Sequence, residues 1–247
     1  MDKVPRSEDS WKTIANNVKS GKSYLYNIGD EKEVSINGNN YTLRVANNST
    51  PSECNGENFS QTACGFVVEF VDIVETKRMN PSVEHNGTNY QYGWNVGRWP
   101  ASEMWTYANG AFFNNLPEDL RNVIINTKVI SGHGKSDKSN FPSTDKIYLL
   151  STHEVWEDVT SNNRLKTYDT AYNNTRQLDY YRSKGITTSN YSGAKKTSPG
   201  SSSGSYWWLR AAHSNNDIGF WGVDSSGRGD NAGAYTTIGF APAFRIG

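Results

Sequence analysis

The chain of 247 residues carries 25 lysines and arginines against 25 aspartates and glutamates, so its formal net charge is zero. Because the basic residues are scattered, the sequence lacks the electrostatic footprint of a nucleic-acid-binding protein, and an aromatic content of 13% excludes a disordered chain. No apolar run reaches the roughly 18 residues of a membrane span. No signal-peptide core is visible near the start, so we expect export to need a signal outside this chain.

The first elements predicted along the chain are a helix, a hairpin and a strand. In "DSWKTIANNVKSG" the apolar residues share one helical face, with Asp9 or Ser10 as the cap and Gly21 just past the end. In "EVSINGNNYTLRVA" two alternating apolar stretches flank an Asn-Gly turn, which indicates a hairpin. The apolar run "GFVVEFVDIV" is typical of a buried strand.

The middle of the chain predicts two short helices, a further strand and one more helix. In "SEMWTYANGAFFNNLPEDLRNVIIN", Ser102 caps the first helix and Pro117 takes the first helical position of the second. We expect "DKIYLLS" to be a buried strand and "TRQLDYYRSKG" a short helix ending at Gly185. Residues 186–205 are rich in Ser, Gly and Thr and predict a mobile loop. Early helices and late strands without βαβ alternation predict an α+β fold.

Two cysteines, Cys54 and Cys64, lie in a polar, loop-like stretch. They predict either a disulfide, which would imply an oxidising compartment, or two free thiols beside a buried strand. With no Cys-x-x-Cys motif and no histidine close to either, zinc binding is not expected. We expect neither a metal nor a cofactor.

Catalytic motifs are weak in this sequence. "GSSSG" at residues 200–204 lacks the strand before and the helix after that a nucleophile at Ser202 needs. "HEVWE" at residues 153–157 lacks the second histidine of a zinc-protease helix and predicts a strand-to-loop edge. An enzyme remains an alternative only if folding assembles a pocket, with these side chains as candidates: Glu69, Glu103, His133 and His153.

The C-terminal stretch is the most unusual part of the sequence. Two aromatic anchors, residues 206–208 and 240–244, enclose a segment dominated by Gly, Ser, Asn and Asp. These polar residues are either turns between core strands or a surface for contact.

Several segments resemble a bacterial and phage domain with a C-type-lectin-like fold, many of whose members are variable proteins of diversity-generating retroelements. They are "GWNVGRWPASEMWTYANGAFFNNLPEDLRNVI", "STDKIYLLSTHEVW", "TRQLDYYRSKG", "WWLRAA", "FWGVDSSG" and "IGFAPAFRI". The resemblance covers residues 10 to 246. It implies a tail at residues 1–9 and a single domain at 10–247, with a variable region at about 211–238.

In that family, adenine mutagenesis of asparagine codons yields many amino acids but never Trp, Lys, Glu, Gln or Met. Between Ala212 and Gly239 only Trp221 falls outside the permitted set. The resemblance therefore implies a scaffold for the site formed by Trp208, Phe220 and Trp221. It implies diversified, ligand-binding positions at His213, Asn215, Asn216, Asp217, Ile218, Gly219, Gly222, Asp224, Arg228, Asp230, Asn231 and Tyr235.

The sequence also departs from related families. The calcium signatures of lectins are absent, and the reactive cysteine pair of formylglycine-generating enzymes has no counterpart, because both cysteines precede residue 65. The resemblance thus implies a non-enzymatic binding protein, displayed on a bacterial cell surface or a phage particle, with a protein or glycan ligand. The alternative is a fixed carbohydrate-binding module that stacks exposed aromatic side chains on sugar rings, with Trp207, Trp208, Trp221 and Tyr235 as candidates.

Overall fold

The structure is a computed structural model that describes residues 8–81, 83–85, 88–90, 94–159 and 163–247, with only the backbone described at 83–85, 88–90 and 163. Its α-helices are short: α1 (Trp11–Lys19), α2 (Glu103–Tyr107), α3 (Phe113–Asn115), α4 (Glu118–Arg121), α5 (Thr152–Val155), α6 (Asn163–Tyr168) and α7 (Asp179–Ser183). Shorter 3-10 turns are Ser23–Leu25, Ser52–Asn55, Gln61–Ala63, Trp99–Ala101, Tyr172–Asn174 and Ser192–Ala194.

The strands of the first half are β1 (Glu31–Ile36), β2 (Asn39–Asn47), β3 (Val67–Phe70), β4 (Glu75–Lys77), β5 (Val83–His85), β6 (Thr88–Tyr90) and β7 (Thr127–Ser131). Those of the second half are β8 (Phe141–Asp145), β9 (Lys196–Thr197), β10 (Gly204–Ser205), β11 (Trp207–Ala212), β12 (Gly219–Val223), β13 (Gly229–Gly233), β14 (Ile238–Phe240) and β15 (Ala243–Arg245).

Helix α1 forms where its apolar spacing and cap predict it. The Ser10 hydroxyl accepts a hydrogen bond from the Thr13 amide at 3.1 Å, and Gly21 takes a positive φ of 72° just past the helix end. Asp9, which the sequence assigned to the tail, accepts a hydrogen bond from the Tyr26 hydroxyl at 2.8 Å and so contacts the fold. Residues 1–7 of that expected tail lie outside the described part of the chain.

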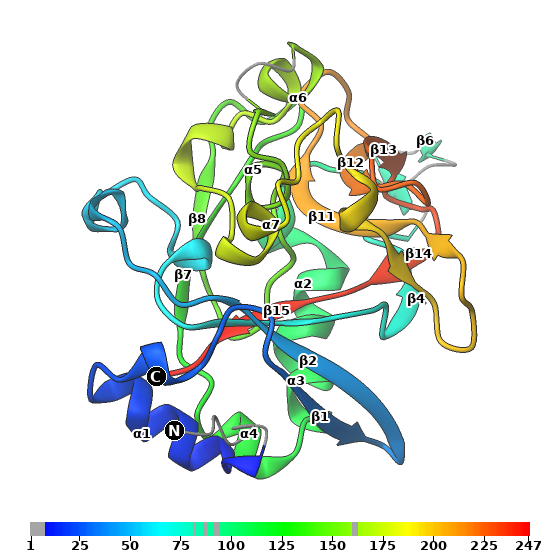
Figure 1. Cartoon of the computed structure of the whole chain (residues 1–247). Helices are drawn as coiled ribbons and strands as arrows, with labels where there is room; N and C mark the ends of the chain where they lie inside the picture. The colour runs from blue at the N-terminus through cyan, green and yellow to red at the C-terminus, as the bar shows by residue number, and fades with distance from the viewer. Residues whose placement is uncertain (1–7, 82, 86–87, 91–93, 160–162) are drawn as a thin grey trace.

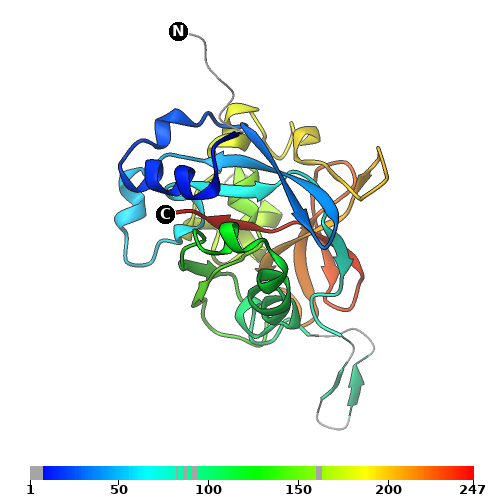
Figure 2. The same cartoon turned by 90° about the horizontal axis from the view of Figure 1, so that it is seen from below.

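The predicted hairpin is β1 and β2, joined by Asn37 and Gly38, which both adopt a positive φ. It belongs to a four-stranded sheet with the order β1-β2-β3-β15. The predicted strand "GFVVEFVDIV" supplies β3, and its four residues are all buried. In Figure 2, the red strand β15 lies beside β3, with which it pairs antiparallel.

The second large sheet has the order β13-β12-β11-β14-β4. Strands β11, β12 and β13 are antiparallel neighbours, whereas β14 runs parallel to β11. Figure 1 shows these strands gathered at one end of the molecule, with β15 running back from them toward β1 and β2. Residues 238–245 therefore link the two sheets, because β14 belongs to one and β15 to the other.

The predicted helical block between residues 102 and 121 is helical but not regular. Ser102 caps α2 by accepting from the Trp105 amide at 3.0 Å, and a π-helical turn, Ala108–Phe112, then separates α2 from α3. Pro117 is the residue that precedes α4 rather than its first helical position. The carbonyl of Pro117 still accepts the first helical hydrogen bond, from Arg121 at 2.9 Å.

Two further local predictions were wrong. In segment "DKIYLLS", Asp145 ends strand β8 and residues 147–150 are fully inaccessible, but residues 146–151 form a single bridge, from Tyr148 to Ala243, instead of a ladder. Segment "HEVWE" overlaps helix α5 rather than a strand edge. A reciprocal capping box starts α5, since Ser151 bonds to the backbone of Glu154 and the Glu154 carboxylate accepts from the Ser151 amide.

These short helices and small, mostly antiparallel sheets make an α+β fold, as predicted. One hydrophobic cluster runs through both large sheets, from Trp11 to Ile246. Within the described ranges, no helix has the length and apolar character required to cross a membrane.

Candidate ligand-binding face

A buried aromatic frame underlies the C-terminal segment. The side chains of Trp207, Trp208, Phe220 and Trp221 are fully inaccessible. Each indole N–H donates to a backbone carbonyl: Trp208 to Lys77 at 2.9 Å, and Trp221 to Tyr168 at 3.2 Å. Burial with a satisfied N–H fixes the ring orientation, so these residues are scaffold, and the tryptophans are not exposed for stacking on a sugar.

The loop at residues 213–218 is held from outside the C-terminal segment by Asn95. This fully buried side chain donates from Nδ2 to the carbonyls of Gly219 at 2.8 Å, Asn216 at 2.9 Å and His213 at 3.3 Å. The backbone amide of Asn95 also donates to the backbone carbonyl of Asp217 at 2.8 Å. A loop whose carbonyls are bound in this way keeps one backbone conformation while its outward side chains remain open to solvent.

The loop also fixes itself and contacts a second outside segment. The Asn216 side chain accepts from the amides of Ile218 and Gly219, at 3.0 and 2.6 Å. The backbone carbonyl of Asn216 accepts from the backbone amide of Lys135 at 3.1 Å. The Ser136 hydroxyl donates to the Asp217 carboxylate, so the loop is bound on two sides.

Strand β13 meets an arginine from α6. The Arg164 guanidinium donates to Asp230 at 2.9 Å and to Asn231 at 2.7 Å, and it lies over the Trp221 ring at 5.3 Å. Tyr206 donates its hydroxyl proton to the other oxygen of Asp230. About half of the Arg164 side chain is exposed, so the cluster forms part of the surface.

The charges of this cluster shift the pKa values of its members. Burial raises the pKa of Asp230, but the hydrogen bonds from Tyr206 and Arg164 outweigh it and hold that pKa below its usual value. Burial and the hydrogen bond to Asp230 raise the pKa of the Tyr206 phenol. Near neutral pH the cluster is therefore a direct ion pair between Arg164 and the Asp230 carboxylate, with the neutral groups of Tyr206 and Asn231 bonded to it.

His213 lies beneath this surface rather than on it. It is 5% exposed, stacks on Tyr168 with ring centroids 4.8 Å apart, and lies 5.0 Å from the Trp221 ring. Burial, followed by repulsion from Arg164, lowers the pKa of His213 to about 4. The prediction that His213 is a surface contact residue was wrong, because its imidazole packs against the aromatic frame.

The remaining predicted contact positions divide by exposure. Arg228 and Asn215 are exposed, while seven positions are partly exposed: Asn216, Asp217, Ile218, Asp224, Asp230, Asn231 and Tyr235. Gly219 and Gly222 are buried in β12. The face that reaches solvent is thus built from the 213–218 loop, β13 and the turn between β12 and β13.

Four of the predicted variable positions have roles in holding the backbone. A Cβ at Gly222 would lie 2.9 Å from the Trp207 carbonyl oxygen, and one at Gly219 would lie 3.1 Å from Asn216 Oδ1. Asn216 bonds to its own loop, and Asp224 accepts from the Ser226 and Arg228 amides at 2.8 and 3.0 Å. Gly219 and Gly222 are buried in β12, so neither is an exposed contact position; a Cβ at Gly222 would press on the backbone, while one at Gly219 would meet a side chain that has to shift slightly. Whether the codons of these two glycines vary stays a prediction.

The enzyme alternative required four side chains to meet, and none of the hydrogen bonds within the described chain joins any two of them. Glu69 is buried, Glu103 is exposed at the start of α2, and His133 and His153 each bond through Nδ1 to a carbonyl, of Gly134 and Tyr172 respectively. In the part of the chain that the structure describes, no three His, Cys, Asp or Glu side chains form a group that could hold a metal ion.

Glu69 instead belongs to a buried charge cluster between the sheets. It accepts from Arg44 at 2.9 Å and from Lys196 at 3.1 Å. Burial raises the pKa of Glu69, but both cations outweigh it and lower that pKa, while burial lowers the pKa of Lys196 to about 8 against the opposing effect of Glu69. These compensated charges join β2, β3 and β9, which is a structural role.

A second buried ion pair anchors β11. Arg210 and Glu154 are fully buried and form two hydrogen bonds of 2.7 Å. The Arg210 guanidinium also donates to the carbonyl of Leu149 at 2.9 Å. The C-terminal segment is therefore tied to α5 through charges that are costly to leave unpaired.

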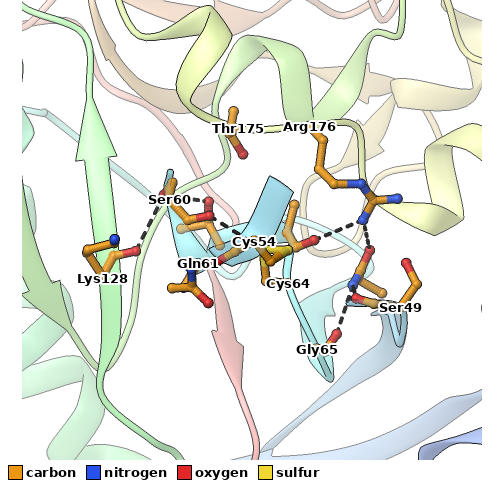
Figure 3. The surroundings of a disulfide bond; sticks show 12 residues. Ser49, Cys54, Ser60, Gln61, Cys64, Gly65, Lys128, Thr175 and Arg176 are labelled. Atoms are coloured by element: carbon orange, nitrogen blue, oxygen red, sulfur yellow. Dashed lines mark hydrogen bonds between the residues drawn. A yellow bond between two sulfur atoms is a disulfide. The ribbon is translucent and has the colours of Figure 1, made fainter. Parts of the chain in front are cut away.

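Cys54 and Cys64 form a disulfide. Figure 3 shows it beside the 3-10 turn at residues 61–63, with Arg176 reaching the same loop. The Arg176 guanidinium donates to the backbone carbonyl of Ala63 and to the side-chain oxygen of Asn47, both at 2.9 Å. The disulfide thus closes the polar loop of residues 54–64, and Arg176 fixes this loop to the core at Ala63.

The family of the chain follows from residues 72–247, which match the model of a domain of unknown function (DUF6273). The chain belongs to this family, and the match includes the whole candidate face together with Asn95 and Arg164. No curated protein and no solved structure matches the chain.

Proposed function

We propose that this chain is a non-enzymatic ligand-binding domain with a C-type-lectin-like arrangement, whose C-terminal face presents a variable surface to a protein or glycan. The observation that carries the proposal is that residues 207–238 combine a buried scaffold with solvent-exposed side chains on a fixed backbone. The tryptophan and phenylalanine side chains of the segment are buried, while two residues outside it, Asn95 and Arg164, hold its loop and its edge strand. Such preorganisation spares a binding surface the entropy of ordering its loops.

The amino-acid composition of the segment supports diversification. Between Ala212 and Gly239, Trp221 is the one residue that adenine mutagenesis of asparagine codons would not yield, and it is also a buried member of the frame. Among the side chains that reach solvent, Asn215, Asn231 and Tyr235 are of the types enriched in paratopes, and Arg228 is of a type found at their hot spots. On the basis of exposure, we limit the proposed variable positions to Asn215, Asp217, Ile218, Arg228, Asp230, Asn231 and Tyr235.

The proposed place of action is a bacterial cell surface or a phage particle. A disulfide persists in oxidising surroundings, so the Cys54–Cys64 bond supports a site of action outside the cytoplasm. The mixed charges of the face, with Arg164 paired to Asp230 and Arg228 paired to Asp224, suit a ligand surface that is itself polar and of both signs.

Sequencing the gene and its flanks in many isolates tests the proposal. We expect adenine-specific differences at the codons of the seven positions, none at those for Gly219, Gly222 and Trp221, and a near-copy of the segment beside a reverse-transcriptase gene. The codons for residues 31–70, which encode the first sheet, are the internal control. An unvarying segment without a copy, or variation at the control codons to the same degree, would overturn the proposal.

A further inference from the structure

A polar hollow of about 220 Å³ lies at the other large sheet, between the start of β2 and the loop after β9. One wall is the start of β2, the opposite wall is the loop after β9, and Phe70 and Ile73 are the buried members of its lining. The residues used in the argument below are Asn40, Tyr41, Thr42, Asp72, Thr197 and Ser198. None of the residues proposed above for the variable face lines this hollow.

The walls of the hollow are fixed by hydrogen bonds between them. The Val71 amide donates to the Thr42 carbonyl, and the Ile73 amide donates to the Thr197 carbonyl, both at 3.0 Å. The Asp72 carboxylate accepts from the Thr197 amide at 2.8 Å. Three segments far apart in the sequence are thereby held in one arrangement, so the hollow is preformed.

Several polar side chains that line the hollow are not used by the fold. Within the described chain, the amide of Asn40 and the hydroxyls of Tyr41, Thr42 and Ser198 form no side-chain hydrogen bond. The second carboxylate oxygen of Asp72 is equally uncommitted. These groups offer several acceptors and donors around a space the size of a small ring.

The hollow offers no cation to an anionic ligand. The ammonium group of Lys196, next in the chain to Thr197 of the lining, is buried and donates to Glu69 at 3.1 Å and to the carbonyls of Phe70 and Val71 at 2.6 and 3.1 Å. The Tyr41 ring, held edge-to-face against Phe70 with centroids 6.0 Å apart, adds an aromatic surface. The chemistry therefore favours a neutral, hydroxyl-rich ligand with one apolar face.

We infer that this hollow binds one neutral sugar ring, with Tyr41 against the ring, Asp72 accepting from its hydroxyls, and Asn40, Thr42 and Ser198 completing the contacts. Its volume lies below the roughly 300–1,000 Å³ of sites for drug-sized ligands, which limits the occupant to a single ring or a chain end. The site is independent of the variable face, so each of the two proposals survives failure of the other.

The test is NMR titration of the isotope-labelled full chain with neutral methyl glycosides of glucose, galactose, mannose and N-acetylglucosamine at millimolar concentrations. We expect at least one glycoside to shift the amide signals of residues 40–42, 72 and 197–201. Shifts confined to other regions, or no shift with any of the four, would overturn the inference. Methylammonium is the competing probe, and binding of that cation alone would show that Asp72 selects an amine instead.

Two substitutions and a control complete the test. Tyr41→Ala removes the aromatic surface and should weaken glycoside binding roughly tenfold. Asp72→Asn retains the acceptor for the Thr197 amide and should weaken binding without loss of folding, so it tests the site even if Tyr41→Ala is unstable. Tyr24→Ala, at an exposed tyrosine that does not line the hollow, is the control. Equal affinity in all three variants and the unaltered chain would refute the assignment.

Discussion

Replacing Asn95 by alanine should loosen the candidate face while leaving the rest of the fold in place. The Asn95 Nδ2 group has two protons for three carbonyls, so the contacts at 2.8 and 2.9 Å are full hydrogen bonds and the one at 3.3 Å is weaker. Two hydrogen bonds at about 1 kcal/mol each, with loss of packing at a buried position, give a destabilisation of about 2–4 kcal/mol.

Asn95→Asp is the isosteric comparison. It turns the donor into a carboxylate facing carbonyl oxygens, so at neutral pH it should cost at least as much as alanine. Because such a site favours the protonated carboxyl, the folded-state pKa of Asp at this position lies above its unfolded value. The stability of Asn95→Asp relative to Asn95→Ala should then improve as pH falls through that raised pKa.

Urea unfolding measures the free energies, and hydrogen exchange locates the effect. In Asn95→Ala, the amides of Ile218 and Gly219, which bond to Asn216, should exchange faster than in the unaltered chain. Asn215→Ala, at an exposed position of the same loop, should stay within about 0.5 kcal/mol. If both Asn95 variants also lie within that range with unchanged exchange, Asn95 does not hold the loop.

Gly222→Ala should cost about 1–3 kcal/mol in urea unfolding, since its Cβ would lie 2.9 Å from the Trp207 carbonyl oxygen; a neutral result would restore Gly222 as a variable position. His213 has a pKa of about 4 in the folded chain against about 6.5 in the unfolded chain. The neutral imidazole therefore contributes fully to the free energy of unfolding above pH 6.5, and this contribution is lost as pH falls toward 4. NMR titration checks that pKa, and an unshifted value would contradict the burial of His213. Cys54→Ser with Cys64→Ser should lower stability by about 2–3 kcal/mol for a separation of 10 residues, and a calorimetric melting temperature equal to that of the oxidised chain would refute this.

Local signals in the sequence were sufficient for the elements that local interactions stabilise. Helix α1 follows from its cap and apolar spacing, and the β1–β2 hairpin from Asn37 and Gly38. The α5 capping box was equally visible, as Ser151 three residues before Glu154, but the apolar residues around it suggested a strand. Segment "DKIYLLS" has strand-like residues, yet the core buries it without a paired neighbour along its length.

The candidate face was predictable only in part, because its decisive contacts join distant segments. The buried frame of Trp208 and Trp221 follows from the cost of exposing large aromatic side chains. Nothing near Asn95 or Arg164 in the sequence indicates that one binds the 213–218 loop and the other binds β13. His213 was misplaced because a polar segment gives no sign of which residue turns inward.

The position of β14 and β15 near the end of the sequence decides which variants of this gene could give a folded protein. Both large sheets are completed by residues 238–245, so a nascent chain leaves β3 and β4 without these partners until that stretch is synthesised. The proposed variable codons lie upstream of it. A frameshift or premature stop among them would remove both closing strands and leave unpaired sheet edges, which favour aggregation and degradation. Under the proposed diversification, only in-frame changes would then yield a folded product. The requirement for β14 and β15 would thus remove frameshifted and truncated variants at the level of folding.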